Sequence, residues 1–523
     1  MRARRQDLRS FVTAIDGHAR DRPDAVAIRY QGCDTTYASL AAGSHRVAGA
    51  LLAAGHARGA RIGLLDLNSE RYLEAFVGTA KAACVPVGIN SRLAAPELEY
   101  VIRDARMPLV LVGRDHYELV GAIESRLPEG TAIVALHGGH ARWPDYQGWR
   151  DAQPPDPSPR MPGPDDDLLQ LYTSGTTGHP KGACHTLRAW SAWGEMCAHA
   201  GWGRYSHDTS MLACMPLYHI AALGTSLLAL QSGARVVLLR RFDAAACLEA
   251  IERERVTDTL LAPAIIQALL AAPDSGQRDL SSLKQLLYGA APISENLLER
   301  VRQRLPCRLV QLYGMTENLG LSTFLAPEDH EPALGRLRSS GRPYRENELC
   351  IVDPEGRVLP PGAIGEVLVR GPTQMRCYWN NEAATREALA GSWLHTGDAG
   401  YLDADGCLFL LDRVQDMIIR GGENIYPAEV ENALAGHASV AEVAVIGVPD
   451  ERWGEAVKAL VVPQPAARPD LESLRAFAAA RIASYKLPAS VDLVESLPRN
   501  ASGKVLRRQL REPYWAGRDR RVG

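Results

Sequence analysis

The chain is 523 residues long, which is too long for one ordinary hydrophobic core and predicts about three or four folding units. Apolar residues make up 46% and charged residues 23%, as in an ordinary soluble globular protein. With 58 Lys and Arg against 61 Asp and Glu, the net charge of −3 excludes a global basic field that would draw the chain to nucleic acid or to an anionic membrane.

Cysteine usage and the N-terminus bear on the compartment. The cysteines form no CxxC pair, which argues against a zinc site or a disulfide framework and favours a reducing, cytoplasmic compartment. They are Cys33, Cys84, Cys184, Cys197, Cys214, Cys247, Cys307, Cys350, Cys377 and Cys407. The N-terminal segment MRARRQDLRSFV is basic but is not followed by an apolar region, so we expect no signal peptide.

The first third of the chain alternates between helix and strand patterns. YASLAAGSHRVAGALLAAG has apolar residues at helical spacing, and RIGLLDL after it predicts a strand. Ser69 is placed to cap the next helix and Pro96 to begin a third, while VPVGIN and PLVLVG predict strands. This alternation predicts crossover units on a parallel sheet. Residues 141–166 contain seven prolines and predict a surface connection at a boundary between subdomains.

A second alternating block covers about residues 167–330. Residues 209–234 carry no formal charge and are long enough for a membrane span, but Pro216 and several polar residues interrupt them, so we expect a buried strand, turn and helix. Residues 345–412 have short strands between turns, and the pattern beyond 412 predicts a compact α+β unit. The predicted fold is therefore α/β. A large N-terminal domain, residues 1–411, has two alternating α/β subdomains plus a small β-barrel-like subdomain, and a small α+β C-terminal domain covers residues 412–523.

A loop with the sequence YTSGTTGHPKG, residues 172–182, is the strongest local signal for phosphate binding. Its glycines let backbone amides converge on an anion, its hydroxyls donate further hydrogen bonds, and Lys181 adds a positive charge. The nucleotide P-loop pattern nevertheless fails, because Pro180 stands where the second glycine belongs and Gly182 follows the lysine. The loop therefore predicts a phosphate site of another kind.

Six further motifs follow this loop in order: MPLYHI, YGAAPI, QLYGMTE, HTGD, DRVQDMIIRGGENIYPAEVE and NASGKVLRR. Together with the loop they closely resemble the AMP-forming acyl-CoA synthetase family, which includes adenylation domains and luciferases, from about residue 8 to 512. The resemblance implies that ATP adenylates a carboxylic acid and that a thiol, coenzyme A, then displaces AMP. It also implies a mobile C-terminal domain and a requirement for Mg²⁺.

The resemblance assigns roles to residues of these motifs. Lys504, Thr316, Glu317 and His219 are implied to be catalytic, and Glu317 with the Thr173 hydroxyl is implied to hold Mg²⁺. The implied ATP and AMP site consists of Thr173, Ser174, Gly175, Thr176, Thr177, Lys181, Gly289, Ala290, Ala291, Tyr313, Gly314, Thr316, Asp398 and Arg413. Taken singly, Tyr313 or His219 could be a core residue, Asp398 a turn residue, and Glu317 or Lys504 a solvated charge.

The C-terminal domain is implied to swing about a hinge near residues 412–416, with Gln415 at the hinge position where relatives carry Asp or Lys. Its coenzyme A side is implied to contain Gly421, Gly422, Trp453, Tyr485 and Lys486. Basic residues that some relatives carry after the tyrosine are replaced by Leu487 and Ala489. As a hypothesis, Lys486, Arg240 and Arg241 supply the missing charge.

The acyl pocket is implied to include His219, Leu223 and Gly224. The stretch after His219 is small and apolar and has no Asp to pair with an ammonium group, so we expect an acid with an uncharged tail. A medium- or long-chain fatty acid is the first choice and an aromatic acid of the benzoate or cinnamate type the second.

The sequence also leaves open a separate carrier protein as acceptor, a luciferase-like oxygenase and a non-catalytic nucleotide-binding relative. Intact Lys504, Glu317 and Asp398 argue against the last of these. The expected partners are the acid, ATP and coenzyme A, without nucleic acid or a transmembrane segment, and a homodimer is left open.

Overall fold

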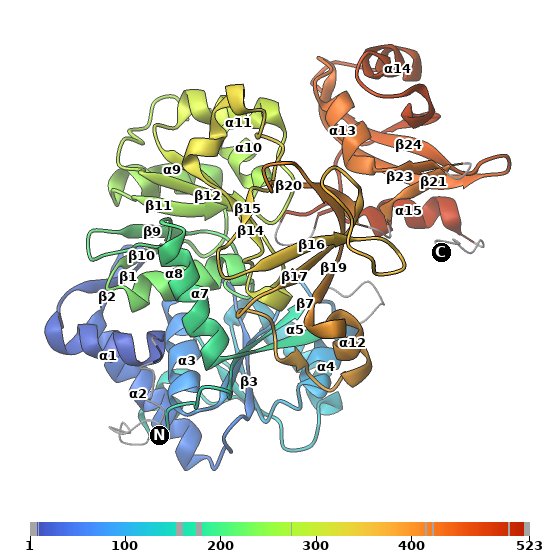
Figure 1. Ribbon diagram of the computed structural model, residues 1–523. Helices are drawn as coiled ribbons and strands as arrows, with labels where there is room; N and C mark the ends of the chain where they lie inside the picture. Colours follow the sequence, from blue (N-terminus) through green and yellow to red (C-terminus); the bar gives the residue numbers. More distant parts are fainter. Residues whose placement is uncertain are drawn as a thin grey trace, which may run out of the picture.

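The computed structural model describes residues 8, 10–152, 160–173, 180–273, 275–413, 416–420, 423–499 and 503–516, without the side chains of residues 412, 413 and 424. Figure 1 shows a large part built from sheets with helices packed on them, and a smaller C-terminal unit at its side. No helix in the described ranges is long and apolar enough to cross a membrane. The predicted fold class is confirmed.

The first large sheet has the strand order β18-β8-β7-β4-β3-β5-β6 within the described residues. The pairs of β4 with β3 and β7, of β3 with β5 and of β5 with β6 are parallel, whereas β8 and β18 add antiparallel strands at one edge. The bounds are Arg61–Leu65 (β3), Val85–Gly88 (β4), Leu109–Val112 (β5), Ala132–Ala135 (β6), Asp167–Thr173 (β7), Lys181–Thr186 (β8) and Cys377–Tyr378 (β18). Strands β3, β4 and β5 are buried along their whole length, which explains why their residues, apart from Arg61 at the start of β3, do not alternate between apolar and polar.

The second large sheet has the order β15-β14-β13-β12-β11-β9-β10-β1-β2 in the part of the chain that is described. Its central strands are parallel, and β2, β14 and β15 are antiparallel to their neighbours. The bounds are Val26–Tyr30 (β1), Cys33–Thr36 (β2), Ser210–Ala213 (β9), Arg235–Leu238 (β10), Asp258–Leu261 (β11), Gln285–Gly289 (β12), Arg308–Tyr313 (β13), Thr323–Leu325 (β14) and Arg342–Pro343 (β15).

Strands that follow one another in the chain are divided between the two large sheets in a way that the sequence pattern did not predict. Strands β1 and β2 belong to the second sheet although they precede the first, and β7 and β8 belong to the first sheet although they follow residues 141–166. The expected boundary at residues 141–166 was therefore wrong as a division between sheets. That segment also contains a short helix, α6 (Tyr146–Asp151), capped by the Asp145 carboxylate.

Helices cover the large sheets, and their starts follow the capping signals in the sequence. Ser69 accepts a hydrogen bond from the Tyr72 amide at the start of α3, and Pro96 lies in the first turn of α4, as predicted. The bounds are Phe11–Asp21 (α1), Tyr37–Ala53 (α2), Glu70–Lys81 (α3), Ala95–Asp104 (α4), Tyr117–Ile123 (α5), Leu187–His199 (α7), Ile220–Gln231 (α8), Ala244–Arg253 (α9), Pro263–Ala271 (α10), Glu295–Arg304 (α11) and Glu382–Ala388 (α12).

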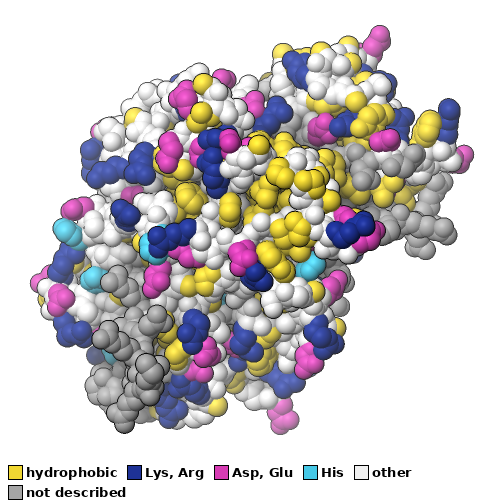
Figure 2. Space-filling view, viewed as in Figure 1, with side chains coloured by type: hydrophobic (Ala, Val, Ile, Leu, Met, Phe, Trp, Pro, Cys, Tyr) yellow, Lys and Arg dark blue, Asp and Glu magenta, His cyan; other side chains and the backbone are white. Residues whose placement is uncertain are grey.

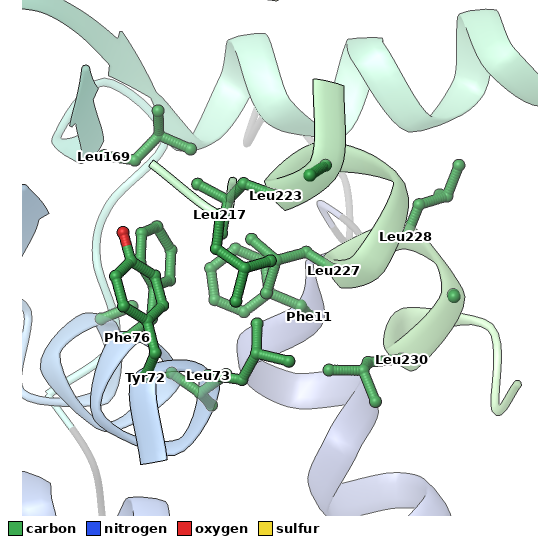
Figure 3. Close-up of a cluster of buried hydrophobic side chains, with 14 of the residues drawn as sticks. Phe11, Tyr72, Leu73, Phe76, Leu169, Leu217, Leu223, Leu227, Leu228 and Leu230 are labelled. Atoms are coloured by element: carbon green, nitrogen blue, oxygen red, sulfur yellow. The ribbon is translucent and has the colours of Figure 1, made fainter. Parts of the chain in front are cut away.

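The uncharged stretch at residues 209–234 is a buried strand, a turn and a helix, as predicted. Strand β9 is fully buried, and α8 packs against α1. Figure 3 shows Leu223, Leu227 and Leu230 of α8 gathered with Phe11 of α1 and Phe76 of α3. The absence of charge therefore reflects burial on several sides of α8.

The β-rich segment forms a third sheet, antiparallel, in the order β16-β17-β19-β20 within the described ranges. Its strands are Glu348–Val352 (β16), Gly365–Arg370 (β17), Leu394–Leu402 (β19) and Leu408–Arg413 (β20). Figure 2 shows hydrophobic side chains gathered over the middle of this face, and Val358 and Ile364 beside these strands are exposed.

The C-terminal unit is a compact α+β structure. Its described strands are Ile418–Arg420 (β21), Glu423–Ile425 (β22), Val440–Asp450 (β23), Gly454–Pro463 (β24) and Ser490–Leu493 (β25), with helices Pro427–Ala435 (α13), Leu471–Ala479 (α14) and Arg507–Trp515 (α15). Its own core includes Val430, Val445 and Leu474. Helix α13 contacts β20 of the larger part. The exact boundary between residues 411 and 412 stays a prediction.

Candidate active site

Two neighbouring parallel strands of the second sheet, β12 and β13, bring two of the predicted motifs together. Gly289 ends β12 opposite Leu312 of β13, and a Cβ added to Gly289 would lie 2.3 Å from the Leu312 carbonyl oxygen. Ala290 and Ala291 follow Gly289, and Gly314 lies in the turn after β13. The carboxyl ends of parallel strands are the usual place for ligands in α/β sheets, so the sequence order and the topology agree.

Glu317 lies where the two large sheets meet. It is 5% exposed and belongs to a 3₁₀ turn, Thr316–Asn318, that contacts β8. The Tyr378 hydroxyl on β18 donates to Glu317 Oε1 at 2.6 Å, and the Met375 amide donates to the Glu317 carbonyl oxygen at 2.6 Å. Lys181 Nζ lies 5.2 Å from the centre of the Tyr378 ring. Tyr378 therefore connects the carboxylate of one motif with the lysine of another.

Tyr313 and Asp398 form the second polar pair of the site. The Tyr313 hydroxyl donates to Asp398 Oδ2 at 2.6 Å, and the Asp398 amide donates to the Thr396 hydroxyl at 3.0 Å. Asp398 lies opposite Arg413 in the β19–β20 ladder. The structure thus brings together three residues that the sequence predicted for the nucleotide, although the Arg413 side chain lies outside the described part.

His219 and His185 are neutral imidazoles near this junction. Burial lowers the pKa of each to about 4, with Arg92 contributing at His219. His219 precedes α8, and its Nε2 atom is buried without a hydrogen-bond partner among the described residues. An unpaired buried nitrogen is costly, so this atom is available to a polar group of a ligand. Leu223, by contrast, lies within the hydrophobic core beside α1.

Gly224 lies next to an aromatic wall formed by Trp193 of α7. A Cβ added to Gly224 would lie 3.2 Å from a ring carbon of Trp193. The Trp193 indole donates to the Leu319 carbonyl oxygen at 2.8 Å, just after the turn that carries Glu317. The first turns of α8, Trp193 and the Glu317 turn are therefore neighbours.

The segment before Lys504 reaches the N-terminal domain. A Cβ on Gly503, which has φ +84°, would lie 3.5 Å from the Ala262 Cβ and 3.6 Å from the Ala264 Cβ, at the start of α10. Arg499 donates to the Gly503 carbonyl oxygen at 2.7 Å and forms an ion pair with Glu442. Lys504 thus directly follows a residue that lies close to α10, on the face of the C-terminal unit that is turned toward the larger part.

Trp453 and Tyr485 are both exposed on the C-terminal unit, by 40% and 38%. Arg420 joins them: its guanidinium lies 5.7 Å from the Trp453 ring, and Nη1 donates to the Tyr485 carbonyl oxygen at 2.7 Å. Lys486 instead forms an ion pair with Glu429 at 2.6 Å. In the N-terminal domain, Arg240 forms ion pairs with Asp115 and Asp66, and Arg241 is exposed.

Some predicted positions lie outside the described residues, namely Ser174, Gly175, Thr176, Thr177, Gln415, Gly421 and Gly422. Thr173 ends β7, and its hydroxyl is 3.5 Å from the Lys181 carbonyl oxygen. Sequence reasoning missed Tyr378 and Arg420. Tyr378 lies in the aromatic pair of CYWN and Arg420 directly before the glycines of GGEN, but neither sequence reveals the contact that the fold makes.

Two family models match the chain. The one described as AMP-binding enzyme matches residues 15–379, and the one described as AMP-binding enzyme C-terminal domain matches residues 429–504. This chain belongs to the AMP-binding enzyme family. The predicted resemblance is therefore confirmed.

Relatives of this AMP-binding enzyme act on acids of different kinds. Fatty acid–[acyl-carrier-protein] ligase ScoC of Streptomyces coeruleorubidus is 39% identical over 517 residues, covering 98% of this chain and 98% of its own length. Feruloyl-CoA synthase of an Amycolatopsis species is 39% identical over 504 residues, covering 95% and 97%. The crystal structure of the anthranilate CoA ligase AuaEII in complex with anthranoyl-AMP matches with a TM-score of 0.90 and 30% identity, covering 98% of this chain and 99% of that one.

The donor set of this AMP-binding enzyme fits magnesium held largely by phosphate. In the described residues no group of three or more His, Cys, Asp or Glu side chains is arranged around a metal position. Glu317 is a single buried carboxylate, with one oxygen bonded to Tyr378. Mg²⁺ commonly takes one or two protein oxygens and completes its shell with phosphate and water, so one carboxylate suffices.

Proposed function

We propose that this enzyme is an ATP-dependent acid–CoA ligase, which joins a carboxylic acid to AMP and then transfers the acyl group to coenzyme A. The observation that carries the proposal is the meeting of Glu317, Tyr378 and Lys181 at the junction of two sheets, in a chain of the AMP-binding enzyme family. A carboxylate is a poor electrophile because its oxygen is a poor leaving group, and joining it to AMP supplies a good one. The products of the first step are acyl-AMP and pyrophosphate.

In the first step, the enzyme has to bring two anions together. Lys181, with the hydroxyls and amides of the loop before it, stabilises the β- and γ-phosphates, and Lys504 from the C-terminal unit reaches the carboxylate and the α-phosphate. Thr316 donates to the α-phosphate. Glu317 would hold Mg²⁺, and the bound ion would neutralise phosphate charge. Asp398 accepts hydrogen bonds from the ribose hydroxyls, while Tyr313 lies against adenine.

In the second step, the thiol has to replace AMP at the acyl carbon. Lys504 belongs to a loop seated against α10, so access from this side requires the C-terminal unit to move about residues 412–416. Two exposed aromatic residues, Trp453 and Tyr485, both contact Arg420, the first through its ring and the second through its backbone carbonyl oxygen, and this set suits the adenine and phosphate groups of coenzyme A. Of the cations suggested for coenzyme A, Lys486 would first have to leave Glu429.

The acid has an uncharged tail. His219 presents a neutral nitrogen, the residues after it are apolar, and Trp193 closes the space beside Gly224. A medium- or long-chain fatty acid is the first candidate, because the side chains of residues 220–222, directly after His219, are all apolar. An aromatic acid is the second candidate, favoured by the flat Trp193 face and by the equal identity of the feruloyl-CoA synthase and the fatty acid ligase.

The test is pyrophosphate release over a panel of acids, with and without coenzyme A. We expect ATP to yield AMP and pyrophosphate, and coenzyme A to yield a thioester with octanoate or longer acids. Turnover with benzoates and cinnamates only would select the second candidate. Transfer of the acyl group to a phosphopantetheine carrier protein but not to coenzyme A would identify the carrier protein as the acceptor. Release of ADP and orthophosphate would contradict the proposed reaction.

A further inference from the structure

Two cysteines face each other across a pair of strands at the wall of the candidate site. Cys377 of β18 lies directly opposite Cys184 of β8 in the antiparallel ladder. Residues opposite each other in such a ladder have Cα atoms about 4.5–5.5 Å apart and side chains on the same face. A disulfide requires Cα atoms about 4.4–6.8 Å apart, so the backbone already has the spacing that a disulfide needs.

The two thiols differ in access. Cys184 is buried, with its thiol 3.5 Å from Gln170 Oε1 and 3.8 Å from Arg61 Nη2. Cys377 is half-exposed and follows Arg376. One thiol is therefore reachable from solvent, while the other meets only its immediate neighbours. This is the arrangement of an attacking and a resolving cysteine.

The neighbouring thiol and the arginines around the pair favour a thiolate at Cys377. The contact with the Cys184 thiol, followed by the guanidinium groups of Arg376 and Arg61, lowers the pKa of Cys377, whereas Asp167 and partial burial oppose the shift. The same contact, followed by burial, raises the pKa of Cys184. Both arginines are fixed by Asp167, with contacts of 2.5 to 2.8 Å, so the positive groups stay beside the thiols. A thiolate is the form that reacts with peroxides.

We propose that Cys377 and Cys184 are a peroxide-sensitive dithiol that closes to a disulfide between β18 and β8. The Cys377 thiolate attacks hydrogen peroxide, which gives a sulfenic acid at Cys377 and releases hydroxide. The Cys184 sulfur then displaces the sulfenic oxygen, and this oxygen leaves as water with the Cys184 proton. Two thiols are oxidised and one peroxide is reduced to water, so the sequence is balanced.

The disulfide would connect two strands that carry site residues. Strand β8 begins at Lys181, and Tyr378 directly follows Cys377. The modification therefore lies within a few residues of both groups that accompany Glu317. It is consistent with a reducing compartment, where the disulfides that do occur are usually transient.

Mass spectrometry of the native, full-length enzyme after hydrogen peroxide tests the proposal. After free thiols are blocked with N-ethylmaleimide, trypsin releases residues 182–188 and 377–386, each with one cysteine. We expect these two peptides to be joined, and to separate after dithiothreitol. Cys350 is the matched control, because it is half-exposed on a strand but lies opposite Leu368. Cys350 should keep its thiol under the same dose.

Two variants separate the steps. In Cys184→Ser, Cys377 should accumulate as a sulfenic acid that dimedone traps, because no resolving thiol remains. In Cys377→Ser, Cys184 should stay reduced at the same peroxide dose. The wild-type thiol at Cys377 should also react with a disulfide reagent at pH 7 at least threefold faster than Cys350, since each unit of lower pKa adds about three- to fourfold. Loss of both thiols without a joined peptide, or equal reactivity of Cys377 and Cys350, would overturn the proposal. These readouts do not depend on which acid the enzyme ligates.

Discussion

Replacing Tyr378 by phenylalanine isolates one hydrogen bond of the candidate site. The substitution removes the hydroxyl that donates to Glu317 Oε1 at 2.6 Å but keeps the ring that lies 5.2 Å from Lys181 Nζ. Because Glu317 is 5% exposed, water does not readily replace the lost donor. A hydrogen bond to a charged group is worth about 1.5–3 kcal/mol. If Glu317 must be held in place to bind Mg²⁺, kcat/KM for ATP falls by about 10- to 150-fold.

The matched control for Tyr378→Phe is Tyr146→Phe. The Tyr146 hydroxyl also donates to a carboxylate, Glu74 Oε1 at 2.8 Å, and is also buried, but this pair lies between α6 and α3. Both substitutions should lower the free energy of unfolding, but Tyr146→Phe by less, because Glu74 Oε1 keeps its ion pair with Arg150 at 2.7 Å. Only Tyr378→Phe should slow adenylation, because only its partner, Glu317, is proposed to hold the Mg²⁺ of the nucleotide.

The assay measures the two half-reactions separately. Pyrophosphate release from ATP at saturating acid reports adenylation, and thioester formation from supplied acyl-adenylate reports the second step, which needs no magnesium–ATP. We expect Tyr378→Phe to impair the first half-reaction and to leave the second within about threefold of wild type. Adenylation as fast as in Tyr146→Phe, or equal loss of both half-reactions, would refute the role given to Tyr378.

Four further predictions concern the C-terminal unit, the metal and pH. Lys504→Ala should slow pyrophosphate release at least 100-fold and leave thioester formation from supplied acyl-adenylate largely intact; equal losses would exclude a role confined to the first step. Trp453→Ala should raise KM for coenzyme A several-fold without changing acid-dependent pyrophosphate release, and an unchanged KM would remove this residue from the coenzyme A site. Chelation of Mg²⁺ should stop pyrophosphate release but should leave acyl transfer from supplied acyl-adenylate intact. Loss of both activities would contradict a role of the metal in the first step alone. Burial lowers the pKa of His185 from 6.5 to about 4, so the unfolded chain takes up a proton at this residue before the folded protein does. The free energy of unfolding is therefore unaffected by this residue above pH 6.5 and falls as the pH is lowered, by about 2 kcal/mol at pH 5. His185→Leu should show a correspondingly smaller difference between urea unfolding at pH 7 and pH 5, and an unchanged difference would contradict this origin of the pH dependence.

Local patterns predicted the elements of the fold well, because their causes are local. Ser69 caps α3 with its own hydroxyl, and the uncharged residues 209–234 form β9 and α8 because both are buried. The assignment of strands to sheets failed for the opposite reason. Ile28 of β1 lies opposite Val236 of β10, and nothing within either segment specifies a partner so far along the chain. Strand pairing at long range is decided by the tertiary fold.

In the candidate site, too, local features were predictable and long-range contacts were not. The motifs predicted the residue types of the nucleotide site, and the fold brings Tyr313 to Asp398 and places the Lys504 loop against the larger part. The supporting contacts were not predictable, since each joins segments that are distant in sequence. Tyr378 reaches Glu317 from another strand, and the half-exposed pair of aromatic residues on the C-terminal unit is joined by Arg420. The roles of these residues stay predictions until the half-reactions are measured.

The position of Glu317 shows how the division of consecutive strands between the two large sheets bears on the candidate site. It follows β13 of the second sheet, yet its side chain and its carbonyl oxygen are bonded to Tyr378 and Met375, and β18 with Tyr378 is hydrogen-bonded to β8 of the first sheet. The carboxylate and Lys181 therefore reach their relative positions only when the two sheets are docked. A substitution that loosens this junction should lower adenylation before it lowers the stability of either sheet, because the groups proposed to meet the phosphates come from opposite sides of it. On this proposal, the rate of the first half-reaction responds to changes in the contact between the sheets.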